Sequence, residues 1–124
     1  MSVILLPIKP RFVKLILAGD KKFEYRKSVP NKNVTKIVIY ASSPDKRVVG
    51  EVDVRGVVSG SPEYVWAQTG ASGGISREFF NSYFGGRDKA YAYILGDVKK
   101  YSKSLSLADF NVKSAPQNFV YLDE

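Results

Sequence analysis

Short runs in which apolar and polar residues alternate make up much of this chain, and turn residues separate them. An alternation with a period of two is typical of strands that bury one face. A turn is expected at Gly96 and Asp97, after which residues 98–101 continue the sheet. The strands predicted on this basis cover residues 3–8, 22–27, 36–41, 47–58, 89–95 and 117–122.

Three other stretches carry the signals of short helices. Pro10 suits the first position of a helix, where its missing N–H costs nothing, and Gly19 suits the left-handed residue that ends it. Ser61 and Ser76 each stand where a side-chain oxygen caps the first turn. The predicted helices cover residues 10–18, 61–70 and 76–84.

The order of these elements limits the fold class. No long helix separates two strands, as a doubly wound parallel sheet requires, and Gly50 and Gly56 interrupt the longest strand where a closing sheet needs bends. A single turn capped by Ser106 precedes the last strand. We predict an α+β, mainly-β protein: a small mixed β-barrel of about six strands with three short helices, with residues 1–124 as one domain.

Composition narrows the possible chemistry. The chain has no cysteine and no histidine, which excludes disulfides, thiolate metal sites and an imidazole general base. We therefore expect no metal and no cofactor. The apolar start is too short for a signal peptide, and no run approaches the ~20 apolar residues that span a bilayer. A cytoplasmic protein without membrane contact, monomeric or weakly dimeric, is expected.

Positive charge is concentrated in the first part of the chain. The formal net charge is +7, and residues 1–36 hold nine basic against two acidic side chains, so they account for all of it. A localised positive field favours a partner that carries phosphate and speeds its approach. Charge alone leaves open the alternative that this is only a solvated face.

One segment within this basic region combines charges of both signs. Lys21, Glu24 and Arg26 stand within six residues, and crowding them is costly unless they pair with each other or with a ligand. The alternation of residues 22–27 places Glu24 and Arg26 on the side opposite Phe23 and Tyr25. That side faces either solvent or a cavity.

The spacing Gly19-x-Lys21-x-x-Glu24-x-Arg26 resembles that of the ASCH domain, a member of the PUA-like fold. The resemblance implies a β-barrel with a cleft beside its helices, with Lys21, Glu24 and Arg26 at the cleft and the loop of Ser42 and Ser43 as its opposite wall. Related domains bind RNA, and the cleft is suited to a nucleotide or base. Further residues carry the resemblance, in the expected order along the chain: Ile8-Lys9-Pro10, Tyr40-Ala41-Ser42-Ser43-Pro44, Val49-Gly50-Glu51, Ala90-Tyr91-Ala92 and Pro116-Gln117-Asn118-Phe119.

Some ASCH proteins are hydrolases, and here the chain departs from one such branch. That branch, which removes the acetyl group of acetylated cytidine, uses a lysine, a threonine three residues later and a distant glutamate. Lys21 matches the lysine, but Glu24 occupies the threonine position. Residues 70–74, which match the region of the glutamate, contain no carboxylate.

Our main hypothesis is an RNA- or nucleotide-binding module with a basic ligand cleft and a regulatory role in RNA metabolism or transcription. Lys21 and Arg26 would contact phosphate, and Lys9, Lys14 and Lys22 would widen the positive field. Glu24 would accept from a base amine or hold Arg26 in place. The simpler alternative is that Glu24 and Arg26 form a structural ion pair and bind nothing. The expected ligand-binding residues are Lys9, Lys21, Glu24, Arg26, Ser42, Ser43 and Gln117.

Two other hypotheses remain open. In the first, the protein is a hydrolase of RNA or of a modified nucleoside, with Lys21 as general base or electrostatic catalyst and Glu24 as proton carrier. In the second, Tyr64, Trp66 and Tyr83 form a protein-interaction patch. Core packing is the simpler prediction for these aromatic residues, as it is for the others in the helix over 76–84.

Overall fold

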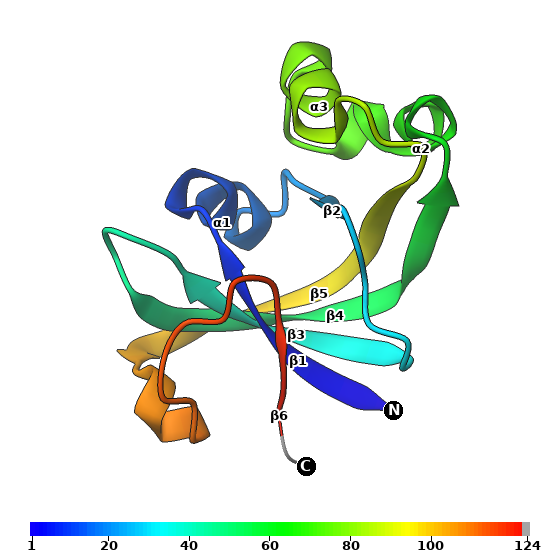
Figure 1. Cartoon of the computed structure of the whole chain (residues 1–124). Helices are drawn as coiled ribbons and strands as arrows, with labels where there is room; N and C mark the ends of the chain where they lie inside the picture. The colour runs from blue at the N-terminus through cyan, green and yellow to red at the C-terminus, as the bar shows by residue number, and fades with distance from the viewer. Residues whose placement is uncertain (123–124) are drawn as a thin grey trace.

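We analysed a computed structural model of the chain, which describes residues 1–122. Six strands form one mixed sheet in the order β2-β5-β4-β3-β1-β6. Figure 1 shows the sheet strongly curved, with the β4–β5 ribbon rising from it to carry two helices. The strands are β1 (Ser2–Ile8), β2 (Phe23–Arg26), β3 (Val34–Ala41), β4 (Arg47–Gly60), β5 (Ala90–Leu105) and β6 (Val120–Leu122).

This architecture confirms the α+β, mainly-β prediction, with one refinement. Strands β1 and β3 pair in parallel, whereas the other neighbours are antiparallel. Because β2 and β6 are the two edges of the hydrogen-bonded order, the barrel is open among the residues described.

The helices begin and end where the local signals indicated. They are α1 (Pro10–Leu17), α2 (Pro62–Thr69) and α3 (Arg77–Phe84), and two 3₁₀ turns cover Gly70–Ser72 and Leu107–Phe110. Ser61 and Ser76 cap α2 and α3 by accepting from backbone N–H groups. Gly19 has a φ of +82°, a conformation that side chains rarely adopt, so the chain turns sharply there after α1.

The prediction of a turn at Gly96 and Asp97 is wrong. Strand β5 continues from Ala90 to Leu105 and pairs with β4 on both sides of this point. The register shifts there, so the extra residue is absorbed as a bulge and the strand bends without reversing. Glycine fits because a Cβ at Gly96 would lie 2.2 Å from the Arg55 side chain.

Three clusters of buried apolar residues hold the sheet and helices together. The largest joins α1 to strands β1, β3, β4 and β5, and another covers the opposite face of the sheet beside the second 3₁₀ turn. The third packs α2 and α3 on β2 and β5, around Phe80 and Phe84. The helical pair therefore sits on the β4–β5 ribbon while α1 sits on the main sheet, which leaves α1 and α3 on opposite sides of a gap (Figure 1).

Candidate functional site

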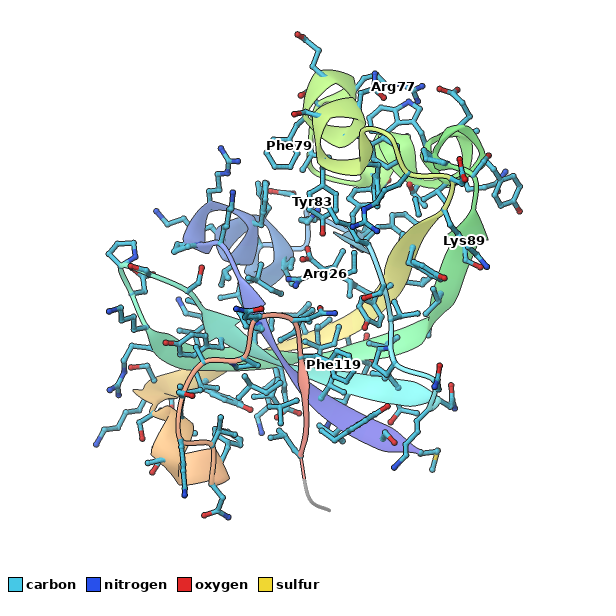
Figure 2. All side chains as sticks on the ribbon, viewed as in Figure 1. Arg26, Arg77, Phe79, Tyr83, Lys89 and Phe119 are labelled. Atoms are coloured by element: carbon cyan, nitrogen blue, oxygen red, sulfur yellow. The ribbon has the colours of Figure 1, made fainter. Side chains whose placement is uncertain are left out.

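A cavity of about 200 Å³ lies between α1, β2 and α3. In Figure 2, Phe79 and Tyr83 point from α3 toward α1 and β2, and Arg26 lies below Tyr83, whereas Arg77 lies on another side of the helix. The cavity is lined by Pro7, Lys9, Phe12, Lys21, Glu24, Tyr25, Arg26, Ser42, Ile75, Phe79 and Tyr83.

Lys21 forms part of the cavity floor and is 2% exposed. Its Nζ atom donates a hydrogen bond to the Gly73 carbonyl at 2.5 Å, and it lies 4.9 Å from the ring centre of Tyr25 and 5.2 Å from that of Phe12. A lysine ammonium is attracted to aromatic faces at such distances. The side chain is therefore fixed from three directions.

Glu24 connects the two cations of the floor. Its Oε1 atom lies 3.9 Å from Lys21 Nζ, and its Oε2 atom accepts from Arg26 Nε at 3.2 Å and from Arg26 Nη2 at 3.0 Å. Arg26 Nη2 also donates to the Pro7 carbonyl at 2.5 Å. One carboxylate thus serves two cations, so the floor carries an excess of positive charge in a largely buried place.

Burial is the main cause of an altered pKa at Lys21. Loss of solvation lowers the pKa of the Lys21 ammonium, Glu24 opposes this shift, and the nearby Arg26 guanidinium adds to it. Lys21 is therefore easier to deprotonate than an exposed lysine. Among ionisable groups, a pKa perturbed by burial and by specific charges in a cavity marks a functional candidate.

Aromatic side chains form the walls above this floor. The rings of Phe12 and Phe79 meet edge to face, with centres 5.5 Å apart, and join α1 to α3. The Tyr25 hydroxyl is hydrogen-bonded to Thr69 Oγ1 at 2.9 Å, which ties β2 to α2. Lys9 is exposed, and its Nζ atom lies 5.9 Å from the Phe79 ring centre, so a further cation stands at the mouth.

The structure brings together five of the seven residues expected to bind ligand. Four charged ones, Lys9, Lys21, Glu24 and Arg26, line the cavity with Ser42. Ser42 lies where β3 ends beside β1, and its hydroxyl donates to the Ile8 carbonyl at 3.3 Å. The other two, Ser43 and Gln117, are exposed and are not among the lining residues.

The aromatic walls were not predicted from the sequence. Tyr25, Phe79 and Tyr83 have the spacing of core residues, and core packing was expected for them. Phe79 and Tyr83 are four residues apart on α3, so they share one face of the helix. This spacing is the feature of the sequence that could have indicated an aromatic wall. The period alone does not distinguish a face that packs solidly from one that borders a hollow.

The other proposed patch is divided in the structure. Tyr64 is 52% exposed, whereas Trp66 packs against Phe80 with ring centres 5.1 Å apart and lies under the Arg77 guanidinium. Tyr83 belongs to the cavity.

Within residues 1–122 no cluster of carboxylates suited to a metal is found. No helix of that part of the chain is long and apolar enough to cross a membrane.

A curved mixed sheet with helices carried beside it, and a cavity between them, places the protein in the PUA-like class. The chain belongs to the ASCH domain family, whose model matches residues 6–108. This confirms the resemblance drawn from the sequence motifs. A crystal structure of the ASCH protein from Zymomonas mobilis superimposes with a TM-score of 0.90 at 26% identity, covering 99% of this chain and 89% of that one. A mutant of the same protein gives 0.91, covering 100% and 92%.

Three curated relatives of different size each contain a segment similar to this chain. An ASCH domain-containing ribonuclease of Zymomonas mobilis is 34% identical over 71% of this chain. A large ribosomal subunit protein uL22 of Ureaplasma parvum serovar 3 is 31% identical over 83% of the chain, and an ATP synthase subunit alpha of that organism is 31% identical over 98%. The chain spans 60%, 33% and 15% of these three proteins, respectively.

Proposed function

We propose that this ASCH domain binds single-stranded RNA and holds one nucleotide in the cavity between α1 and α3. The observation that carries the proposal is the floor of the cavity, where two cations share one carboxylate beneath aromatic walls. Fixed positive charge suits phosphate, and aromatic rings suit a base. Binding of this kind would support a regulatory role in RNA metabolism or transcription.

The groups of the cavity can be assigned to parts of a nucleotide. Lys9 at the mouth and both Lys21 and Arg26 at the floor would contact phosphate. Phe79 and Tyr83 would stack on or flank the base. Glu24 accepts both hydrogen bonds from Arg26 at Oε2, which leaves Oε1 to accept from the amino group of a base such as cytosine. Ser42 adds a hydroxyl at the opposite wall.

The relatives support an RNA ligand through their names. The Zymomonas mobilis relative is called a ribonuclease, and the uL22 relative is a ribosomal protein. Neither name identifies a binding site, so the site assignment depends on the geometry of the cavity.

Fluorescence anisotropy with a labelled single-stranded RNA tests the proposal. Three or four phosphate contacts predict a slope of roughly −2 to −3 when the logarithm of the binding constant is plotted against the logarithm of salt concentration. Lys21→Met, which keeps the buried stem and removes the charge, should weaken binding at least about tenfold, since charge-assisted contacts are worth roughly 1.5–3 kcal/mol.

Lys99→Ala is a matched control for this experiment, because Lys99 is exposed on β5 and does not line the cavity. It should change affinity by much less than Lys21→Met. RNA that fails to bind at low salt, or that binds equally to Lys21→Met and Lys99→Ala, would remove the proposed site.

Hydrolysis is a second candidate function, and the lowered pKa of Lys21 together with the ribonuclease relative favours it. In RNA cleavage the neutral Lys21 amine would take the proton of the attacking 2′-hydroxyl. Glu24, 3.9 Å from Lys21 Nζ, would pass this proton on from Lys21 to the leaving 5′-oxygen, while the 2′-oxygen bonds to phosphorus and the bond from phosphorus to the 5′-oxygen breaks. An acylated nucleoside is the alternative substrate for the same two groups.

Cleavage of an end-labelled RNA separates this function from binding alone. The expected result is turnover in the native protein and its loss in Lys21→Met, while a 2′-O-methyl RNA binds and stays intact. Equal turnover of the native protein and Lys21→Met would show that Lys21 has no catalytic role, and the same test applies to an acylated nucleoside.

A further inference from the structure

A second hollow, of about 270 Å³, lies beside the cavity, between α1 and the start of α3. Phe12, Ile75 and Phe79 line both spaces, so the edge-to-face pair of Phe12 and Phe79 is a wall that they share. Arg11 and Leu15 of α1 complete the outer hollow together with the loop over residues 74–76. We call this second space the outer groove.

Arg11 gives the outer groove its charge. Its guanidinium lies 4.7 Å from the ring centre of Phe12 and 5.1 Å from that of Phe79. The residue is exposed and has no acidic partner among the described ion pairs. A cation held over apolar rings and not neutralised by a carboxylate is well placed to receive an anion.

We propose that the outer groove binds the nucleotide next to the one in the cavity, so that the ligand is an oligonucleotide of at least two residues. This inference rests on the proposed function. Neither space reaches the roughly 300–1,000 Å³ typical of small-molecule sites, whereas the two together do. The second base lies on the apolar surface of Phe12, Leu15 and Ile75.

The phosphate between the two nucleotides crosses the ridge made by Phe12 and Phe79. Lys9 and Arg11 both approach this ridge: Lys9 Nζ lies 5.9 Å and the Arg11 guanidinium 5.1 Å from the Phe79 ring centre. The proposed path of the phosphate passes close to both cations. This arrangement explains why the two spaces share aromatic walls and are bordered by basic side chains of one helix end.

Calorimetric titration with short nucleotides tests the groove. The probes are the four nucleoside 5′-monophosphates, the nucleoside 3′,5′-bisphosphates and the dinucleotides that carry a 5′-phosphate. Stacking of one base on aromatic side chains predicts that the dinucleotide binds on the order of tenfold more tightly than the mononucleotide. The bisphosphate supplies a second phosphate without a second base and should recover only part of this gain.

Arg11→Ala should abolish most of the gain from the second nucleotide and leave the affinity for mononucleotides within about twofold. Lys14→Ala is the matched control, because Lys14 is an exposed cation of α1 that lines neither space. Its dinucleotide gain should equal that of the native protein.

Three results would overturn the inference. Dinucleotides that bind no more tightly than mononucleotides, while both depend on Lys21, would eliminate the outer groove and leave the cavity function intact. Equal losses in Arg11→Ala and Lys14→Ala would show a diffuse field without a groove. Failure of every nucleotide and of longer RNA to bind would remove both the groove and the proposed function.

Discussion

Exchange of Glu24 for glutamine tests the charge balance of the cavity floor, because it keeps the shape of the side chain and removes its charge. The Glu24 side chain is 7% exposed, and its oxygens lie 3.9 Å from Lys21 Nζ and 3.0 Å from Arg26 Nη2. In the Glu24→Gln variant two cations face a neutral amide. The fold must then hold them together without a counter-charge.

The cost of this change can be worked out from the distances. At about 4 Å a pair of unit charges interacts by roughly 4 kcal/mol at an effective dielectric constant near 20. The variant avoids the cost of desolvating a carboxylate, which offsets part of this lost interaction energy. Removing one partner of a buried ion pair typically destabilises a protein by about 3–5 kcal/mol. Since glutamine still accepts from Arg26, we expect a loss of about 3 kcal/mol, which in a chain of 124 residues lowers the Tm by roughly 10 °C.

The loss of stability in Glu24→Gln should depend on pH. Glu24 raises the pKa of Lys21 against the effect of burial, so its removal lowers that pKa further. When the folded-state pKa of a lysine lies below its unfolded value near 10.5, the unfolded chain binds the proton more tightly. Stability then rises with pH between the two values. The deficit of Glu24→Gln relative to the native protein should therefore shrink as the pH is raised toward 10.5.

Thermal unfolding followed by circular dichroism, from about pH 6 to pH 10, measures both effects. Glu63→Gln is the matched control, since Glu63 pairs with Arg77 and its side chain is 81% exposed. An exposed pair is worth about 0–1 kcal/mol, so this variant should lose at most about 4 °C. A Tm for Glu24→Gln equal to that of Glu63→Gln, or a deficit that stays constant with pH, would refute the account of the floor.

Two further predictions concern positions outside the ion pairs. Gly73→Ala should lower the free energy of unfolding by about 1–3 kcal/mol and weaken RNA binding, because the new Cβ would overlap the buried Tyr25 hydroxyl beside the Lys21 hydrogen bond. Chemical denaturation measures the stability and fluorescence anisotropy the RNA affinity. Effects no larger than those of Gly85→Ala would contradict this prediction. Ser106→Ala should cost about 0.5–2 kcal/mol in urea unfolding, because it removes the side chain that caps the second 3₁₀ turn. It should leave RNA affinity unchanged, because Ser106 does not line the cavity, and a change in affinity would contradict this assignment.

Sequence determined the short elements of this protein because their signals are local. Proline at the first position of α1, serine caps on α2 and α3 and a glycine after α1 each act through neighbouring backbone groups. The alternation of strand residues likewise follows from the geometry of a single strand. Local order also placed Lys21, Glu24 and Arg26 together, since the turn at Gly19 and strand β2 lie within a few residues of them.

Pairing in the sheet depended on contacts that no local pattern contains. The pair of glycine and aspartate at 96 and 97 has the composition of a turn, yet β4 continues alongside and the residues form a bulge. The parallel pairing of β1 with β3 joins segments that are about thirty residues apart. A strand's own periodicity does not specify its neighbour, because the partner supplies half of the hydrogen bonds.

The cavity itself was decided only by the tertiary structure. The sequence showed that Phe79 and Tyr83 occupy an apolar face of a helix, but α3 is carried on the β4–β5 ribbon while α1 rests on the main sheet. Because these two supports are separate, the aromatic faces of the helices border a hollow. The same arrangement places the Gly73 carbonyl beside Lys21, although the two residues are 52 positions apart in the chain. The sequence determines the chemistry of each side chain. Whether those side chains enclose a site depends on the distance between α1 and α3, which pack on different parts of the sheet.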